Sequence, residues 1–538
     1  MINQRSLSTA DMPSVRTISV EGLQKRTHSH VADTYNAKKS LRYVSQERSK
    51  EMDDEEFKKL IDSRIYQLKM RFWWFSWIAS LNHALNYVTT SYATSLLDPL
   101  LGGIILGLTW TLNAVSGLTV ATPTVRILGF KASMVISLWG YAIQIATLYW
   151  AIVTDDTTTA WTVAILGSTV AGFTSAVWWT SQGVYFDDIC VAIDEQFSVY
   201  QGHIGAAAAA AEVSESGKAV GSLDSIRADL SAHWTMIYQS ADIIVFLSLS
   251  IFPISGVVSI NGVILGLVCL GLVTSLLGLT FQNVKASGRE VSAAEIWTGV
   301  VAVPRQFRRD ARVSLLAPFV FGFGITTAMF AYYVNDDVVS GSSSLGTVTL
   351  GFLEAWSYFV AVLSAYPYSY IANRFVRGQD WVIQFGSLAF LLCGVFVLAL
   401  PDSVLGQWAA ILFIKGLYGL GRGVFEGSCR AVYAGMFSGE DLSTAFSGQT
   451  LSAGFSGGIC FFLFGVLDQT AISAITIGNG LVALASYGVL MSVDSSRRLP
   501  WSALCSRTSA ENPAVGADPF LRDTGGVSLH EPLILSGN

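Results

Sequence analysis

Twelve long apolar runs limit the fold of this chain more than any other feature of its sequence. Runs of about 20 residues match a hydrocarbon core of ~30 Å, because an α-helix rises ~1.5 Å per residue. Each run is therefore predicted to be a transmembrane helix. The predicted spans are residues 72–96, 102–120, 132–153, 160–186, 233–252, 257–281, 313–333, 345–372, 381–400, 404–425, 444–465 and 471–493.

The charged residues between these runs predict the orientation of the chain. All but two of the 33 Lys and Arg residues lie in the two tails and the even-numbered connections, and the exceptions, Lys415 and Arg422, lie in the tenth span. The odd-numbered connections carry only acids, which are Asp98, Asp155, Asp156, Asp336, Asp337, Asp402 and Asp468. By the positive-inside rule, both termini are predicted to be cytoplasmic.

The composition excludes several classes of protein. With 51% hydrophobic and 13% charged residues, the chain is predicted to be an integral membrane protein. Its net charge of −6 argues against a nucleic-acid partner. None of the six cysteines lies in an odd connection, so we expect neither a structural disulfide nor a metal cluster. No phosphate-binding loop, metal-ligand spacing or activated nucleophile is evident, so we expect no enzyme activity and no cofactor.

The runs divide the chain into regions. Residues 50–71 have apolar residues at helical spacing and predict an amphipathic helix. Within it, residues 56–61 (EFKKLI) fit an acidic di-leucine sorting signal, although an ordinary charged helix is the favoured interpretation. The predicted regions are a cytoplasmic tail with this helix (1–70), a six-helix half (71–281) with a cytoplasmic insertion (187–232), a linker (282–312), a second half (313–493) and a disordered cytoplasmic tail (494–538).

Two cytoplasmic connections are long. The insertion at 187–232 is expected to hold a short helix and a flexible linker. The linker at 282–312 is basic, and its residues 293–303 predict a surface helix. Its arginines either contact anionic lipid or only enforce the topology, and both alternatives stay open.

The two halves carry signs of an internal repeat. At an offset of 247, residues 172–186 (GFTSAVWWTSQGVYF) align with 419–433 (GLGRGVFEGSCRAVY), and at 248 Arg126 aligns with Arg374. Two matches at nearly one offset favour parallel six-helix repeats of the transporter type.

The connection after the second span resembles a motif of the major facilitator superfamily. Residues 122–131 (TPTVRILGFK) keep Arg126 of that motif but have Val125 at its acidic position, and residues 370–377 (YIANRFVR) keep Arg374 with Asn373 there. The resemblance implies an all-α integral membrane fold with twelve transmembrane helices in two pseudo-repeated six-helix halves. Arg126 and Arg374 are gate candidates, although losing both acids puts the usual charge relay in doubt.

A more specific resemblance is to the Unc-ninety-three-like branch, and it covers residues 72–493. Residues 419–437 (GLGRGVFEGSCRAVYAGMF) are similar to its tenth-span pattern, G-x-G-R-G-x-W-E-x-x-x-x-A-V-x-A-x-F, with Phe425 in place of the tryptophan. Residues 178–185 (WWTSQGVY) resemble its W-T-x-Q-G-x-Y. The branch is named for a regulatory partner of a potassium channel and also includes trafficking chaperones and transporters.

Three ionisable residues are predicted near the middle of the membrane, where charges are rare and usually functional. Asp242 lies about nine residues into span five, Glu354 at a similar depth in span eight, and Lys415 eleven residues into span ten. In a facilitator fold they could form one cluster that binds and releases a proton or a small cation. The alternatives are a structural ion pair or three residues on unrelated faces.

Further polar residues are candidates for a gate and for a central cavity. Arg422 and Glu426 are spaced i, i+4 near the expected cytoplasmic end of span ten, where they predict either a gate or a static helix clamp. The cavity candidates are Asn82, His83, Asn86, Trp178 and Gln182. Interhelical hydrogen bonds would demand the same polar residues. Trp178, Trp179 and Tyr185, near the end of span four, are expected in an interfacial belt, and a stacking wall for an organic substrate is the alternative.

These patterns lead to two functional hypotheses. The first is ion-coupled transport of an ion or small molecule by alternating access. The second is a non-transporting regulatory or trafficking subunit of another membrane protein. The expected partners are the lipid bilayer, an unknown small solute or ion and, for the second hypothesis, a membrane protein. The location, whether plasma membrane or endosomal or vacuolar membrane, stays open.

Overall fold

The computed structural model describes residues 54–500 except 205–221, 257, 285–292, 342–344, 346–348 and 494–498. The described chain forms two compact units, which are residues 54–70 with 191–204 and 222, and residues 71–190 with 223–500. The predicted disorder of the two tails, and part of the predicted insertion and linker, lie outside the described residues.

The smaller unit contains the beginning of α2 (Asp54–Ser91) and the end of α6 (Thr157–Ile204). Phe57, Ile61 and Ile65 recur at a spacing of four residues and are buried, which is the amphipathic pattern expected for residues 50–71. Ile61, the last residue of EFKKLI, is only 2% exposed. A helix that buries this side chain favours the ordinary-helix interpretation over an accessible sorting signal.

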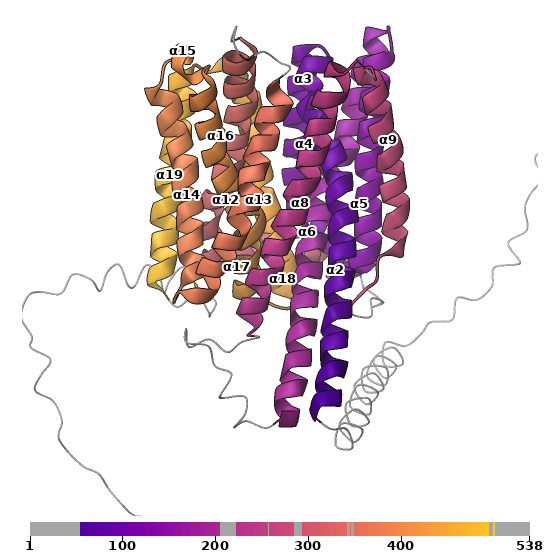
Figure 1. Ribbon diagram of the computed structural model, residues 1–538, viewed down its shortest axis with the longest axis vertical. Helices are drawn as coiled ribbons and strands as arrows, with labels where there is room; N and C mark the ends of the chain where they lie inside the picture. The colour runs from indigo at the N-terminus through magenta and orange to yellow at the C-terminus, as the bar shows by residue number, and fades with distance from the viewer. Residues whose placement is uncertain are drawn as a thin grey trace, which may run out of the picture. The chain divides into compact units, whose positions relative to one another are not determined.

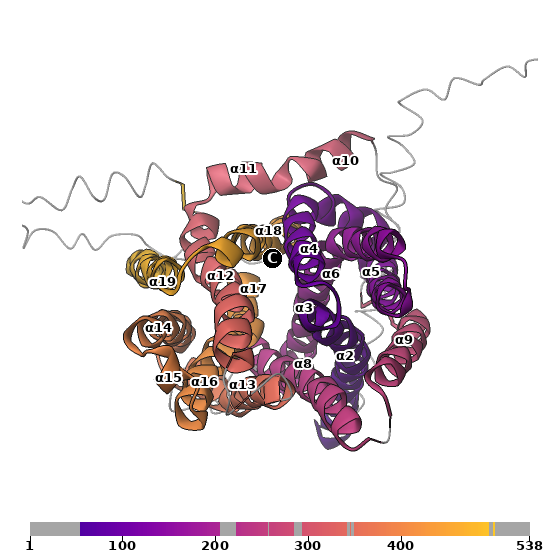
Figure 2. The same ribbon diagram turned by 90° about the horizontal axis from the view of Figure 1, so that it is seen from above.

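The larger unit is a bundle of long helices in two groups, which lie side by side (Figures 1 and 2). The N-terminal group comprises the rest of α2 and α6 with α3 (Ala93–Leu96), α4 (Pro99–Thr119), α5 (Ala121–Val153), α8 (Leu223–Ile254), α9 (Ile260–Leu277) and η1 (Gly278–Thr280). The C-terminal group comprises α12 (Ala311–Met329), η2 (Phe330–Ser340), α13 (Leu350–Arg374), α14 (Gly378–Ala399), α15 (Asp402–Leu405), α16 (Trp408–Gly423), η4 (Val424–Ser428), α17 (Cys429–Met436), α18 (Glu440–Leu463), η5 (Phe464–Val466) and α19 (Gln469–Ser492).

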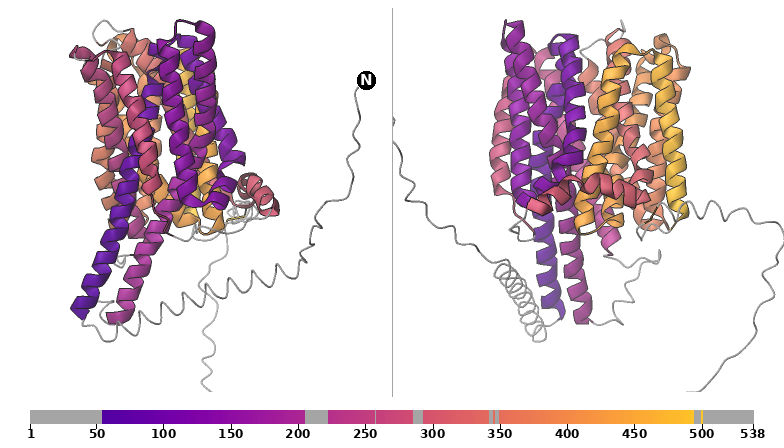
Figure 3. Two further views of the ribbon diagram at one scale, coloured as in Figure 1. Left: turned by 90° about the vertical axis from the view of Figure 1, so that its right-hand side faces the viewer. Right: turned by 180° about the vertical axis from the view of Figure 1, so that it is seen from behind.

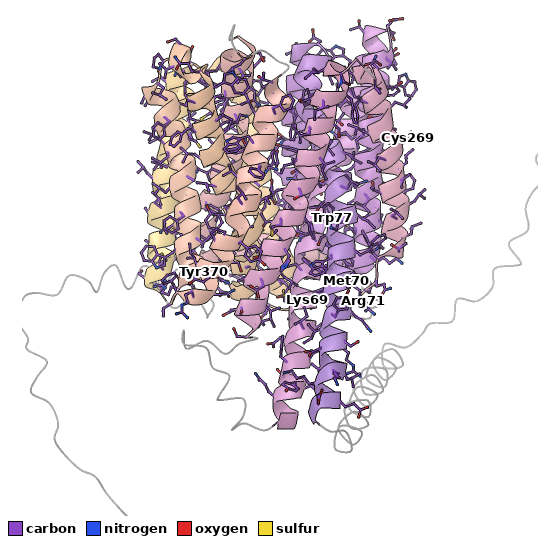
Figure 4. All side chains as sticks on the ribbon, viewed as in Figure 1. Lys69, Met70, Arg71, Trp77, Cys269 and Tyr370 are labelled. Carbon is purple, nitrogen blue, oxygen red and sulfur yellow. The ribbon has the colours of Figure 1, made fainter. Side chains whose placement is uncertain are left out.

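The helices account for the predicted spans. Within the described residues, ten helices are long and apolar enough to cross a membrane. The remaining two predicted spans, the first and the eighth, correspond to α2 and α13, which have 38 and 25 residues but carry more polar side chains. The chain is therefore an integral, multi-pass membrane protein, and its lipid-facing surface exposes apolar and aromatic groups such as Trp77, Cys269 and Tyr370 (Figure 4).

Three helices depart from regular α geometry. The helix α5 is kinked at Gly129, where φ is 72°, a backbone conformation that favours glycine. The kink divides α5 into a short first segment, which carries Arg126, and a longer second one. A π-helix, η2, extends α12 to Ser340. A second π segment, η4, joins α16 to α17, so that the tenth span runs from Trp408 to Met436 instead of ending near Phe425 as predicted. Such π segments are frequent at functional sites.

The helices α4 and α18 of the two groups cross in close contact. A Cβ added to Gly454 would lie 2.6 Å from the backbone nitrogen of Ala114, and one added to Gly117 would lie 2.9 Å from that of Leu451. Only glycine permits backbones to pack at this distance.

The connection between the groups lies across the bundle near one end as α10 (Ala293–Val300) and α11 (Ala302–Arg309) (Figure 3). Val303 and Gln306 are buried and Gln306 donates a hydrogen bond to the carbonyl oxygen of Asp441, whereas Trp297 is 67% exposed. We call this end, which also carries Arg126, the basic end. The opposite end, at the connections with Asp98 and Asp402, is the acidic end.

Candidate functional site

A cavity of about 170 Å³ lies between the two groups of helices. It begins at Arg430 and Phe446, toward the basic end from Arg422, and extends to Ser91 and Ser340, the last residues of α2 and η2 at the acidic end. Its walls are largely aromatic, and they include Tyr87, Trp110, Tyr141, Trp179, Phe323 and Phe425. Polar and charged side chains, among them Asn113, Glu354 and Arg422, lie between the rings. Aromatic walls with polar groups that converge on one space are typical of a small-molecule site.

Hydrogen bonds join the two groups at the basic end, beyond the floor of the cavity. Arg126 of α5 donates to the carbonyl oxygen of Glu440 (2.6 Å), to Thr444 (2.9 Å) and to Ser443 (3.2 Å) on α18. Its guanidinium also lies 3.6 Å from the Glu440 carboxylate. Ser447 is 2.8 Å from Thr122, which extends this contact toward the cavity. Arg126 therefore links the groups at the place where a gate was predicted.

A second contact at the basic end joins α8 to α13. The carboxylate of Asp229 accepts hydrogen bonds of 3.0 Å from Ser369 and from Asn373, the residue that replaces the acid of the facilitator motif. Arg374, the other gate candidate, is the next residue and is exposed at the end of α13. At this position the hydrogen bond between the two groups is donated by Asn373 to Asp229, and not by Arg374.

Lys415 and Glu354 form a buried ion pair beside the cavity. The Lys415 ammonium is fully buried, contacts the Glu354 carboxylate, and donates a 2.7 Å hydrogen bond to the Asn335 side-chain oxygen. Asn335 in turn donates to Glu354 at 2.8 Å. The ammonium also lies 4.9 Å from the Phe330 ring. All three polar side chains belong to the C-terminal group, so the pair holds η2, α13 and α16 together.

Four other charged side chains form a cluster, three of them along α16, η4 and α17 and the fourth on α8. Arg422 lies 3.8 Å from Asp242 of α8 and 4.0 Å from Glu426, and Arg430 lies 3.8 Å from Glu426. All four are at most 3% exposed. The carboxylate oxygens of Asp242 and Glu426 have no hydrogen-bond partner among the described residues. Such loose pairing is unusual, because buried carboxylates normally accept several hydrogen bonds.

Aromatic rings surround the Arg422 guanidinium. Its centre lies 4.4 Å from the Tyr358 ring, 5.1 Å from Tyr87 and 5.5 Å from Phe323, which partly offsets the cost of burying the charge. The titratable and charged groups that face it are Asp242 and Tyr238 from α8, Glu426 from η4, Tyr418 from α16, His83 and Tyr87 from α2, and Tyr358 from α13.

The structure separates the predicted trio of charges. Lys415 contacts Glu354, whereas Asp242 lies beside Arg422 instead, because the inward faces of α8 and α16 meet at the level of Arg422. The predicted depth of Arg422 and Glu426 was also wrong. Since the helix of the tenth span continues through η4 to Met436, both residues lie near its middle and line the cavity.

Of the five predicted cavity residues, two line the cavity and three do not. His83 and Asn86 line the cavity, and His83 lies 2.9 Å from the Tyr238 hydroxyl. Asn82 does not line it, because its amide donates to Gly271, Thr274 and Ser275 of α9. Trp178 and Gln182 are buried outside the lining.

The interfacial belt predicted for span four was wrong. Trp178 is fully buried, and Tyr185, 2% exposed, stacks on Phe130 with ring centroids 3.8 Å apart. Trp179 lines the cavity wall. Inward packing of these rings against neighbouring helices, instead of contact with the lipid headgroups, explains the difference.

Three important residues were missed by the sequence prediction. Arg430 was assigned to a connection because span ten was ended too early, although its i, i+4 spacing from Glu426 was a visible signal. Asn335 and Asp229 gave no signal, because their roles depend on which helices become neighbours.

Comparison with known proteins adds the fold family. No family model and no curated protein matches the sequence. Among solved structures, the chain is similar to the major facilitator superfamily proton:xylose symporter XylE bound to 6-bromo-6-deoxy-D-glucose, with a TM-score of 0.55 and 10% identity over 83% of this chain and 99% of that one. The chain has the major facilitator fold.

A second similar structure is a bacterial homologue of the iron transporter ferroportin in an outward-facing state. Its TM-score is also 0.55, with 10% identity over 79% of this chain and all of that one. The major facilitator fold explains why the cavity lies between two groups of helices. At such low identity, the likeness concerns the fold alone.

Proposed function

We propose that the chain is a proton-coupled transporter that moves a small organic solute by alternating access. The observation that carries this proposal is the cavity between the two groups, which reaches the acidic end while hydrogen bonds join the groups at the basic end. Rocking of the groups would break the contacts of Arg126 and Asp229 and expose the same cavity to the other side.

The charge distribution supports the direction of access. The basic end carries Arg126 and the exposed arginines of α11, and the positive-inside rule assigns such an end to the cytoplasm. In this assignment the cavity faces the extracellular or lumenal side, and both termini are cytoplasmic. The gate is the pair of clusters around Arg126 and Asp229.

Asp242 and Glu426 are the proposed coupling carboxylates, in place of the trio first predicted. Glu354 already has a cation and an amide as partners, whereas neither Asp242 nor Glu426 accepts a hydrogen bond from a described residue. A proton on either acid would remove the counter-charge of Arg422 and weaken its hold between α8 and α16. Protonation and rocking are thereby linked.

Within the major facilitator fold, we propose that the chain belongs to the Unc-ninety-three-like branch, because of the motifs at 178–185 and 419–437. Three residues of these motifs, Trp179, Arg422 and Glu426, line the cavity, which supports a role for the motifs in solute binding. The buried charges and the cavity favour transport over the regulatory or trafficking subunit. Either the plasma membrane or an endosomal or vacuolar membrane fits this proposal.

The test is charge movement in proteoliposomes that contain the purified protein. Steps of pH and additions of organic solutes are applied, and the current is recorded for the wild type, Asp242→Asn and Glu426→Gln. The expected result is a solute-dependent proton current that both variants reduce to the level of empty liposomes. Asp155→Asn, the same change in an exposed connection, should keep the current.

Two outcomes would count against the proposal. If both variants keep the wild-type current, protons do not bind at these acids. If folded wild-type protein gives no current and no solute uptake in any gradient, the regulatory or trafficking role becomes the better account.

A further inference from the structure

Arg422 is a buried permanent charge whose hydrogen-bonding capacity is only partly used. Its Nη1 donates to the hydroxyls of Tyr418 (3.2 Å) and Tyr87 (3.4 Å). Its Nε has no partner among the described residues. The carboxylate oxygens nearest to Nη2 are 3.8 and 4.0 Å away, which is beyond hydrogen-bond distance. The guanidinium therefore keeps N–H donors that no described group accepts.

Arg430 places a second guanidinium in the cavity wall. It donates to the backbone carbonyl oxygen of Glu426 at 2.7 Å, and its centre lies 5.0 Å from the Trp234 ring and 5.4 Å from the Trp179 ring. Its Nη2 lies 3.8 Å from the Glu426 carboxylate, again too far for a hydrogen bond. Two arginines therefore lie at the floor of one cavity. Arg422 is near Asp242 and Glu426, Arg430 is near Glu426, and none of these pairs is within hydrogen-bond distance.

The two signs of charge behave differently at this site. Arginine does not lose its proton in proteins, whereas Asp242 and Glu426 can each take one up. Arg422, Arg430 and Glu426 line the cavity, whereas Asp242 does not. When the acids are protonated, the floor of the cavity therefore presents positive charge to a solute. A cationic solute would be repelled there, and an anion would supply the missing counter-charge.

From this arrangement we propose that the substrate is an organic monoanion, a carboxylate on an aromatic or apolar body, which Arg422 anchors and Arg430 supports. The guanidinium fork matches a carboxylate in a bidentate pair. The rings of Trp110, Trp179 and Phe323 would cover the body of the solute. The inference rests on the proposed function, because it makes the proton the partner that enters with the anion.

The experiment compares three aromatic probes that differ in charge. Benzoate carries a carboxylate, benzamide is neutral and benzylamine is a cation. Binding to the purified full-length protein is measured by equilibrium dialysis of each labelled probe, with folding followed by tryptophan fluorescence. The expected result is that benzoate binds at least about tenfold more tightly than the other two, a difference of ~1.4 kcal/mol.

Variants then locate the binding site. Arg422→Lys keeps the positive charge but loses the planar fork, so benzoate affinity should fall at least about tenfold. Arg422→Gln should abolish binding. Arg308→Gln, which removes an exposed arginine of α11, should leave it unchanged. If an Arg422 variant does not fold, the comparison of the three probes on the wild type still decides the charge preference.

Each contrary result overturns the inference. Benzamide or benzylamine binding as tightly as benzoate would exclude an anion site. If neither benzoate nor the larger indole-3-acetate binds, an anion site is likewise excluded. If Arg422→Lys and Arg422→Gln both bind benzoate with full affinity, Arg422 is not the anchor of the carboxylate. Because dialysis needs no flux, benzoate binding without current would contradict the transport proposal alone. Solute-driven current without carboxylate binding would contradict only this inference.

Discussion

Replacing Lys415 with methionine tests the energetic role of the buried ion pair. Methionine fills a similar volume without charge, and it leaves the Glu354 carboxylate and the Asn335 side-chain oxygen without their cation. Lys415 is fully buried and the Glu354 side chain is 12% exposed, so water can replace little of what is lost. Breaking such a pair costs about 3–5 kcal/mol, because one uncompensated charge remains buried.

Removing both charges should cost less than removing one. In Lys415→Met/Glu354→Gln no charge is left, and the new amide oxygen can still accept the hydrogen bond from Asn335. The double variant should therefore regain about 0.5–3 kcal/mol relative to Lys415→Met, which is the range of coupling energies for residues in contact. Recovery on adding a second substitution is the signature of an ion pair.

The assay is equilibrium unfolding in mixed micelles titrated with sodium dodecyl sulfate and followed by tryptophan fluorescence. Lys58→Met is the matched control, because Lys58 is exposed on α2 and should change the free energy of unfolding by less than about 0.5 kcal/mol. The reasoning would be refuted if Lys415→Met were as stable as the wild type, or if the double variant were as unstable as the single one.

Two further predictions concern the packing and the contacts between the groups. Gly454→Val should destabilise the protein by more than about 2 kcal/mol, because its Cβ would lie 2.6 Å from the Ala114 nitrogen. Gly478→Ala is the control and should be neutral in the same titration, because no atom lies within 4 Å of the added Cβ. Equal stabilities would contradict the close crossing. Arg126→Ala should increase maleimide labelling of Ser443→Cys, which is 6% exposed here, because it removes a bond that closes the basic end. Unchanged labelling would show that other contacts hold this end closed.

Much of the fold could be predicted from the sequence because the membrane imposes one-dimensional rules. Span length and the side on which basic residues lie depend on the order of residues, not on which helices become neighbours. The errors arose where local geometry changes, as at η4, where a π segment carries span ten on to Met436. The polarity of α2 and α13 did not prevent their prediction, because most of their polar residues are uncharged Ser, Thr, Asn and Tyr among apolar ones.

The candidate site was less predictable, because it depends on how each helix is rotated about its axis. The depth of Asp242, Glu354 and Lys415 could be counted, but not the direction in which each side chain points. Glu354 and Lys415 meet, whereas Asp242 meets Arg422. Asn82 illustrates the same limit, because it lies one residue before His83 yet faces α9 instead of the cavity.

Alternating access is the central claim, and distances between spin labels measure it most directly. One pair, at Leu128 and Ser438, reports on the basic end, and the other, at Leu100 and Val466, reports on the acidic end; all four positions are exposed. Double electron–electron resonance in liposomes at high and low pH, with and without benzoate, should show opposite changes. The basic-end distance is predicted to lengthen as the acidic-end distance shortens. Distance distributions that stay the same in every condition would contradict the account and indicate a static membrane subunit.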